Sequence, residues 1–296
     1  MQIALKNTMK LSVVALFALA ACGGAVGMDE NEDDATAAKS QMFVFAPDNR
    51  TCNMGACSGR YVTALKSNTK TLVDSIDYSK SGVPASMVKD LNAAALGEVV
   101  LYGTIDSKKV LNVTAAYRGM PGQTAQGNDA FYTVTDGSAK ASCTAASCDT
   151  EYALNRITGE GKYFSSPDVT GAMVGLADAG WMTEQVRSHG ALTAGKMKAT
   201  KNDKGATQTI LTANQVFAKL PVTQVCPEFK MSACPSGQTR AYSRDANRCL
   251  VPAACVVQSV CPMNMRACSE GYTLASWPGA NGGCPQYACD PTWSVQ

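Results

Sequence analysis

Two stretches of this 296-residue chain repeat the same order of cysteines, aromatic residues and strand-forming residues. Residues 52–61 contain Cys-x4-Cys followed by a tyrosine, and residues 143–152 contain the same pattern 91 positions later. Two further pairs of segments match in the same order: 101–105 with 193–197, and 111–121 with 211–221. Repeats at such a spacing are whole structural units. We therefore expect two copies of one unit, at 41–122 and 130–221. Tyr61 should then be equivalent to Tyr152, and Tyr117 to Phe217, and these aromatic side chains are expected to be mostly buried.

Each copy is expected to begin with two strands around the cysteine loop, to continue into one helix and to end with two strands. The helices are expected after Pro84, over apolar positions 87–96, and after Pro167, over apolar positions 169–176. The closing strands are expected at 98–105 with 110–117, and at 191–198 with 207–218. Runs of strands with one helix per unit predict an α+β fold of two tandem β-rich units, followed by a small disulfide-rich C-terminal region.

That C-terminal region, 222–296, contains eight cysteines in two similar groups of four. The groups are Cys226, Cys234, Cys249 and Cys255, then Cys261, Cys268, Cys284 and Cys289. Repeats of about 30 residues cannot bury enough apolar surface to fold unaided, so disulfides are expected to stabilise them. Four cysteines allow three pairings within each repeat, and the sequence leaves these open.

The amino terminus has the pattern of a bacterial secretory signal. Lys6 and Lys10 precede a short apolar run that ends in Leu-Ala-Ala-Cys22. This ending resembles the bacterial lipobox, and the resemblance implies a lipoprotein signal peptide at 1–21 and a lipid anchor, with palmitate or a related fatty acid, on Cys22. Residues 22–40 are expected to form an acidic tether. Gly23 after the anchor favours the outer membrane of the cell envelope. The alternatives are an ordinary signal peptide with a chance cysteine, and a metal-binding acidic segment.

Removal of Cys22 from the count of 13 leaves an even number of cysteines in an oxidising compartment. Six disulfides are the simplest arrangement of the twelve remaining cysteines. Cys52 is expected to pair with Cys57, and Cys143 with Cys148, because each pair is separated by four residues and flanked by strands. The alternative pairing joins one copy of the repeat to the other.

The charge of the chain excludes one class of partner. The chain has 26 Lys and Arg against 24 Asp and Glu, and cleavage of the signal peptide removes two lysines and leaves the chain formally neutral. A neutral chain without a basic block has no electrostatic footprint for nucleic acid, so no nucleic-acid partner is expected.

Residues able to support catalysis or metal binding are sparse. His189, the one histidine, is expected to be a polar helix-end residue beside a glycine C-cap, with a catalytic dyad or triad as the alternative. The Ser-x-x-Lys spacings at 67–70 and 86–89 are attributed to chance rather than to a serine enzyme. Met263 and Met265 are expected to be filler rather than copper ligands, and cysteine pairing competes with zinc binding. We expect no catalytic residue, no metal and no cofactor.

Three arginines in the first cysteine repeat are spaced by four: Arg240, Arg244 and Arg248. A helix would align them on one face. In a disulfide-held loop they are expected to be separate surface charges. The alternative is that one of them is presented to a trypsin-like protease.

The pattern of residues 41–221 resembles a family of secreted, mainly myxobacterial proteins known as a domain of unknown function. The matching segments are 43–57, Tyr61, 115–118, 131–148 and 215–217, although both cysteine loops lack the proline common in that family. The C-terminal repeats are weakly similar to antistasin-type protease inhibitors, through the turns at 245–249 and 281–284. The first resemblance brings no activity. We therefore predict an outer-membrane lipoprotein with a non-enzymatic role in binding or surface interaction, with the membrane, through its lipid anchor, and a protein or a protease as candidate partners. The alternatives are a cysteine-rich protease inhibitor and an enzyme of a type that the sequence does not show.

Overall fold

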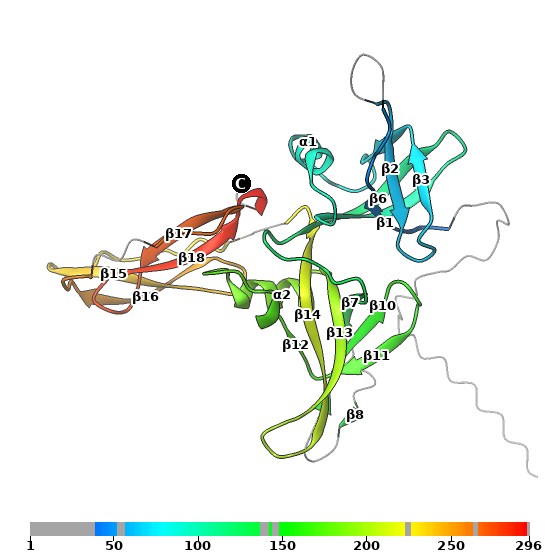
Figure 1. Ribbon diagram of the computed structural model, residues 1–296. Helices are drawn as coiled ribbons and strands as arrows, with labels where there is room; N and C mark the ends of the chain where they lie inside the picture. The colour runs from blue at the N-terminus through cyan, green and yellow to red at the C-terminus, as the bar shows by residue number, and fades with distance from the viewer. Residues whose placement is uncertain are drawn as a thin grey trace, which may run out of the picture. The chain divides into compact units, whose positions relative to one another are not determined.

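The protein is mainly β. A computed structural model describes residues 39–51, 57–136, 142–143, 148–222, 226–262 and 266–294 (Figure 1). The described part contains 18 strands and two α-helices, of nine and ten residues, and 12 of the strands belong to one sheet. The predicted α+β class is therefore wrong, because one large, mostly antiparallel sheet dominates the packing and both helices are short.

Apart from β8 and β9, which occur in the second list alone, the described elements of the two copies follow one another in the same order along the chain. The first copy contains β1 (Gln41–Phe45), β2 (Arg60–Ala64), β3 (Lys70–Val73), β4 (Ser75–Asp77), α1 (Ala85–Ala93), β5 (Val99–Ile105) and β6 (Val110–Gly119). The second contains β7 (Ala130–Asp136), β8 (Ser142–Cys143), β9 (Cys148–Asp149), β10 (Glu151–Asn155), β11 (Gly161–Phe164), β12 (Ser166–Asp168), α2 (Ala179–Ser188), β13 (Leu192–Lys201) and β14 (Thr207–Leu220). The four closing strands lie where the alternating sequence predicts them.

Both copies also have the same strand order within the sheet. The order is β3-β2-β1-β5-β6 in the first copy and β11-β10-β7-β13-β14 in the second, with β4 parallel to β6 and β12 parallel to β14. The copies are joined where β6 pairs antiparallel with β14, from Ala116 opposite Leu220 to Gly119 opposite Phe217. At the centre of this joint Arg118 is opposite Ala218. The sheet is therefore continuous through both copies.

A β-bulge recurs in the closing hairpin of each copy. The register shifts between Tyr102 and Gly103 in β5, and between Ala194 and Gly195 in β13. A Cβ atom on Gly103 would collide with the carbonyl oxygen of Asn112. The partner backbone therefore approaches too closely for any side chain at this position.

The two helices differ in how well the sequence predicts them. Helix α1 begins directly after Pro84, as predicted. The helix expected at 169–176 is wrong, because Pro167 lies in β12, where it is opposite Leu211 of β14. Helix α2 begins later, after Asp178, whose carboxylate accepts a hydrogen bond of 3.0 Å from the Trp181 amide. An N-cap aspartate before Trp181 and Met182 is a start signal that sequence reasoning missed.

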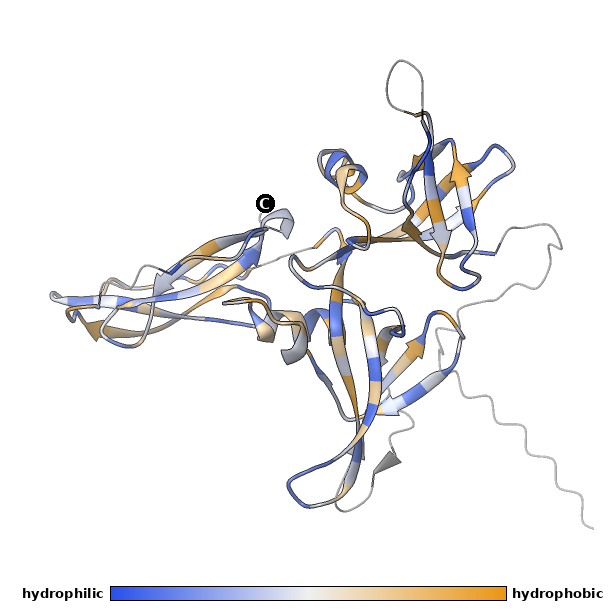
Figure 2. Ribbon diagram, viewed as in Figure 1, coloured by the Kyte–Doolittle hydropathy of each residue, from blue (hydrophilic) through white to orange (hydrophobic). Residues whose placement is uncertain are grey.

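Both faces of the sheet are packed. Leu91 of α1 lies in a buried cluster on the first copy, and Trp181 and Met182 of α2 lie in a second buried cluster on the second copy. A third cluster draws residues from both copies, among them Tyr117 and Phe217. Figure 2 shows the hydropathy along β14, in which residues 215–218 are all buried, as a strand segment covered on both faces requires.

Four equivalent aromatic residues of the copies were expected to be buried. Tyr117 and Phe217 are buried, with exposed fractions of 7% and 1%. Tyr61 and Tyr152 are only half-buried, so the expectation is wrong for them. Tyr61 instead contacts two cations, with Arg50 5.0 Å and Lys70 4.3 Å from its ring centroid.

The C-terminal region consists of two β-hairpins, β15 (Gln238–Arg244) with β16 (Leu250–Val257) and β17 (Tyr272–Pro278) with β18 (Pro285–Pro291). Four disulfides hold them: Cys226–Cys249, Cys234–Cys255, Cys261–Cys284 and Cys268–Cys289. Each repeat therefore joins its first cysteine to its third and its second to its fourth. The prediction that these eight cysteines form disulfides is confirmed.

Candidate functional site

The loop at 226–234 is an exposed segment without regular structure that is fixed at both ends by disulfides. Phe229 and Met231, on either side of the exposed Lys230, are 40% and 47% exposed. The guanidinium group of Arg240 fixes the loop at a third point, because it donates a hydrogen bond of 2.8 Å to the carbonyl oxygen of Ser232. The loop therefore presents apolar and basic side chains from a constrained backbone.

Exposed large apolar residues are concentrated on the cysteine repeats. Among the described residues, six of the seven belong to this region: Phe229, Met231, Leu250, Val257, Val260 and Leu274. Val260 is 99% exposed, and the seventh residue, Leu96, lies after helix α1. Scattered apolar residues are common on protein surfaces, and their concentration on one small region is a feature that many interaction surfaces share.

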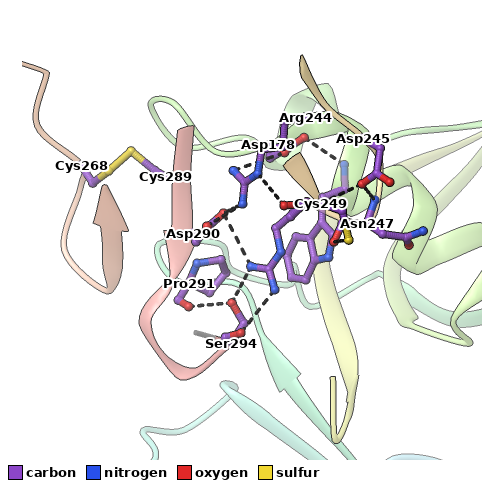
Figure 3. Close-up of polar contacts among 12 residues, drawn as sticks. Asp178, Arg244, Asp245, Asn247, Cys249, Cys268, Cys289, Asp290, Pro291 and Ser294 are labelled. Carbon is purple, nitrogen blue, oxygen red and sulfur yellow. Dashed lines mark hydrogen bonds and ion pairs between the residues drawn. A yellow bond between two sulfur atoms is a disulfide. The ribbon is translucent and has the colours of Figure 1, made fainter. Parts of the chain in front are cut away.

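An ion-pair network connects the two repeats to helix α2 (Figure 3). The carboxylate of Asp290, in the second repeat, accepts hydrogen bonds of 2.7 and 2.6 Å from Arg244 of the first repeat. Arg248 Nη1 lies 3.6 Å from Asp290 Oδ1 and donates a hydrogen bond of 2.8 Å to the Ser294 hydroxyl. Arg244 Nη1 also lies 3.7 Å from Asp178 Oδ2, at the start of α2. The Asp290 carboxylate thus interacts with both Arg244 and Arg248, and the Asp178 carboxylate lies near Arg244 as well.

Arg248 is only 5% exposed, and its guanidinium carbon lies 4.2 Å from the centroid of the Trp181 ring. Burial lowers the pKa of Arg248 below its ordinary value, while the negative charge of Asp290 opposes that change. The group stays a cation, because the guanidinium pKa is far above neutral pH. The prediction that Arg244 and Arg248 are surface charges is wrong, and neither is available to a protease.

The second repeat also packs directly on the second copy of the sheet unit. The amide of Cys289 donates a hydrogen bond of 3.0 Å to the carbonyl oxygen of Leu176, and the Tyr272 hydroxyl donates one of 3.0 Å to that of Pro121. Burial raises the pKa of Tyr272 to about 12. Because Tyr272 and Cys289 belong to the same buried cluster as Trp181, this repeat shares a core with the sheet.

The structure separates the candidate catalytic residues from one another. His189 caps the end of α2 beside Gly190, as predicted, and its Nε2 lies 3.3 Å from Asn247 Oδ1. No described carboxylate forms an ion pair with it. Ser86 and Lys89 are exposed on α1. These positions do not assemble a triad.

Several predicted positions lie outside the described residues, among them Cys22, the signal peptide, nearly all of the tether, Cys52, Met263 and Met265. Cys57 is disulfide-bonded. In the hairpin of β8 and β9 the backbone of Cys143 is opposite that of Cys148, and their side chains are not described. No helix among the described residues is long and apolar enough to cross a membrane.

Comparison with known proteins adds one relative. The chain is 33% identical over 123 residues to an uncharacterized protein of Dictyostelium discoideum. The match covers 40% of this chain and 39% of that protein. No family model matches the chain, and no solved structure matches it.

Proposed function

We propose that this chain is a non-enzymatic binding protein whose cysteine repeats contact a protein partner. The observation that carries the proposal is the concentration of exposed apolar residues on the disulfide-held region. A segment already held by disulfides loses little conformational freedom on binding, which favours affinity. The loop at 226–234, with Phe229 and Met231, is the centre of the proposed surface.

The pattern at the amino terminus supports a cellular location for this surface, at the membrane. Lipid on Cys22 would hold the chain at the outer membrane of the cell envelope, with residues 23–40 as a tether. Replacement of Cys22 with Ala should abolish incorporation of a fatty-acid probe. Unchanged incorporation would contradict the anchor but would leave the binding surface untouched.

Photo-crosslinking tests the surface itself. A photoreactive residue at position 229, in the otherwise complete chain in cells, should crosslink one protein, and excess unlabelled chain should compete with it. The double variant Phe229→Ser, Met231→Ser should fail to compete. Leu96→Ser is the matched control, because Leu96 is also an exposed apolar residue, at 53%, and this variant should compete fully. Competition by the double variant as strong as that by the wild type would overturn the proposal.

A second candidate function is protease inhibition, and the observation that favours it is the position of Lys230. This lysine is exposed in an extended loop held by Cys226 and Cys234, and trypsin-like proteases accept a lysine or arginine side chain. The bond of Arg240 to Ser232 would keep the segment after Lys230 in place after cleavage.

Titration of trypsin with the intact chain tests this candidate. Inhibition should be lost in Lys230→Ala and retained in Arg266→Ala, which changes the exposed basic residue of the equivalent loop. Rapid cleavage after Lys230 with full release of active trypsin would identify the loop as a substrate instead. Inhibition that survives Lys230→Ala would also contradict this candidate.

A further inference from the structure

The closing hairpin of the second copy, formed by β13 and β14, is longer than that of the first. The two hairpins have the same register up to Leu111 and its equivalent Leu211, each of which is opposite the residue two positions after the bulge glycine. The first hairpin turns directly after this row. The second continues through four more pairs, which join residues 198–201 to residues 207–210, before it turns (Figure 1).

The turn itself is the same in both hairpins. In the first, the Asp106 carboxylate accepts hydrogen bonds of 2.9 Å from the amides two and four residues further along. In the second, the Asn202 side chain accepts bonds of 3.0 and 2.9 Å from the amides at the same two spacings. Residues 198–201 and 207–210 are therefore an insertion between an unchanged bulge and an unchanged turn. None of these eight residues is buried, so the insertion adds no residue to a core.

One edge of the hairpin is open along this insertion. Strand β7 pairs with β13 only from Leu192 to Gly195, and β12 pairs with β14 on the other side. No described strand therefore pairs with the outer edge of β13 from Lys196 to Lys201. The backbone N–H and C=O groups of such an edge can pair with a further strand.

The same part of the hairpin is positively charged. Residues 196–210, which we call the arm, contain four lysines and one acid, Asp203 in the turn. The lysines are Lys196, Lys198, Lys201 and Lys204. None of the four ammonium groups forms an ion pair with a described carboxylate. Four positive charges less one negative charge give the arm a net charge of +3, against +2 for the whole chain.

Lysines on an open edge often serve to keep other strands away. Protection alone does not explain the arm, because the first copy has the same strand order without the insertion and has a shorter edge to protect. Removal of the insertion would remove most of the edge as well. A charged edge that is built outside the core of the unit therefore indicates a contact surface.

We propose that the arm binds an extended acidic segment of a protein partner, which joins the sheet as a strand beside β13. The open backbone edge would pair with the main chain of that segment. Lys196 and Lys198 lie on one face of the sheet, since side chains two residues apart point the same way, and they would face carboxylates at alternate positions of the segment. The arm shares no residue with the loop at 226–234, so this proposal does not depend on the function proposed above.

The open edge favours a polypeptide over other anionic partners. Anionic lipid head groups or nucleic acid would use the four lysines but would leave the main-chain groups of the edge without a partner strand. An acidic polypeptide offers carboxylates and main-chain hydrogen bonds together.

Titration of the full chain with synthetic peptides tests the proposal. The probe alternates glutamate and threonine over about six residues, the usual length of a strand. Two further versions are N-methylated, one at the glutamates and one at the threonines, and each lacks the N–H donors of one edge. The unmethylated peptide should bind saturably, and one methylated version should bind at least about tenfold more weakly than the other. Equal affinities for all three would show charge attraction alone and would overturn the proposal. Binding to phosphatidylglycerol vesicles but to no peptide would also overturn it.

Two variants and a control assign the binding to the arm. Lys196→Glu with Lys198→Glu should weaken binding of the unmethylated peptide by at least about tenfold, because attraction becomes repulsion. Lys108→Glu with Lys109→Glu, which reverses two exposed lysines in the turn of the first hairpin, should bind as the wild type does. An equal loss in this control would contradict the site.

Deletion of residues 198–201 together with 207–210 gives the second hairpin the length of the first. The shortened chain should not bind the peptide and should unfold at the urea midpoint of the wild type. Peptide binding by the shortened chain would overturn the proposal. A lower urea midpoint would also overturn it, because the arm would then serve the fold.

Discussion

Gly103 and Gly195 occupy the same bulge in the two copies of the repeated unit. A Cβ on either glycine would collide with a carbonyl oxygen of the partner strand, that of Asn112 for Gly103 and that of Thr212 for Gly195. Neither carbonyl can move without breaking the ladder in which it lies. Both bulges therefore depend on the absence of a side chain.

Gly103→Ala and Gly195→Ala should each destabilise the protein, by about 1–3 kcal/mol, because the added methyl group overpacks the hairpin. Gly127→Ala is the matched control, since a Cβ there would have no atom within 4 Å. Urea unfolding followed by circular dichroism measures all three. Equal free energies of unfolding for Gly103→Ala and Gly127→Ala would show that the hairpin tolerates the side chain.

Asp290→Ala should leave Arg244 and Arg248 buried beside each other without their shared carboxylate. Removal of one partner from a buried ion pair costs about 3–5 kcal/mol. Thermal unfolding should show this loss, and hydrogen exchange should increase first in β15–β18. Asp203→Ala, at an exposed turn between β13 and β14, should change neither measurement. A wild-type exchange rate in Asp290→Ala would mean that the network does not hold the repeats together.

The free energy of unfolding should fall at high pH through two buried tyrosines. Burial raises the pKa of Tyr78 and of Tyr272 to about 12 in the folded protein, against 10.0 for an unperturbed tyrosine. Their phenols stay neutral when folded and ionise more readily when unfolded, so the stability they contribute is present below pH 10 and is lost towards pH 12. Absorbance at 295 nm should show late-titrating tyrosines that Tyr78→Phe and Tyr272→Phe remove. Ionisation of all 10 tyrosines near pH 10 in the folded state would refute this.

The disulfide between Cys268 and Cys289 should matter more than its equivalent in the first repeat. Both bridges span 21 residues, so each should contribute about 3 kcal/mol through the unfolded chain. Cys289 is also 1% exposed in the cluster that contains Trp181, so its loss leaves a cavity as well. The double variant Cys268→Ala, Cys289→Ala should unfold at lower urea than Cys234→Ala, Cys255→Ala. Equal urea midpoints for the two double variants would show that the packing of Cys289 in the shared core adds no stability.

Local patterns in the sequence predicted local structure well. The alternation at 98–105 and 110–117 corresponds to β5 and β6, and the position of Pro84 to the start of α1. Such patterns depend on neighbouring residues, which the sequence shows directly. The two copies have the same strand order because their sequences repeat the same local patterns.

Features that depend on distant partners were missed. Pro167 belongs to a strand because β14 lies beside it, although proline also commonly begins a helix. The spacing of Arg244 and Arg248 suggested exposed charges, but their carboxylate, Asp290, is more than 40 positions further along the chain. A periodic pattern of residues does not identify an ion-pair partner that lies so far along the chain.

The pairing of Arg118 with Ala218 gives the joint between the copies the symmetry of a homodimer. Residues 111–121 match residues 211–221, so these two residues hold equivalent places, and each strand meets its own counterpart about a local two-fold axis. A single copy would end in an open edge strand able to pair with another molecule. With both partners in one polypeptide, association no longer depends on concentration, and the two sides can diverge. Arg118 has already acquired an ion pair with Glu98, 3.1 Å away, while its counterpart is an alanine.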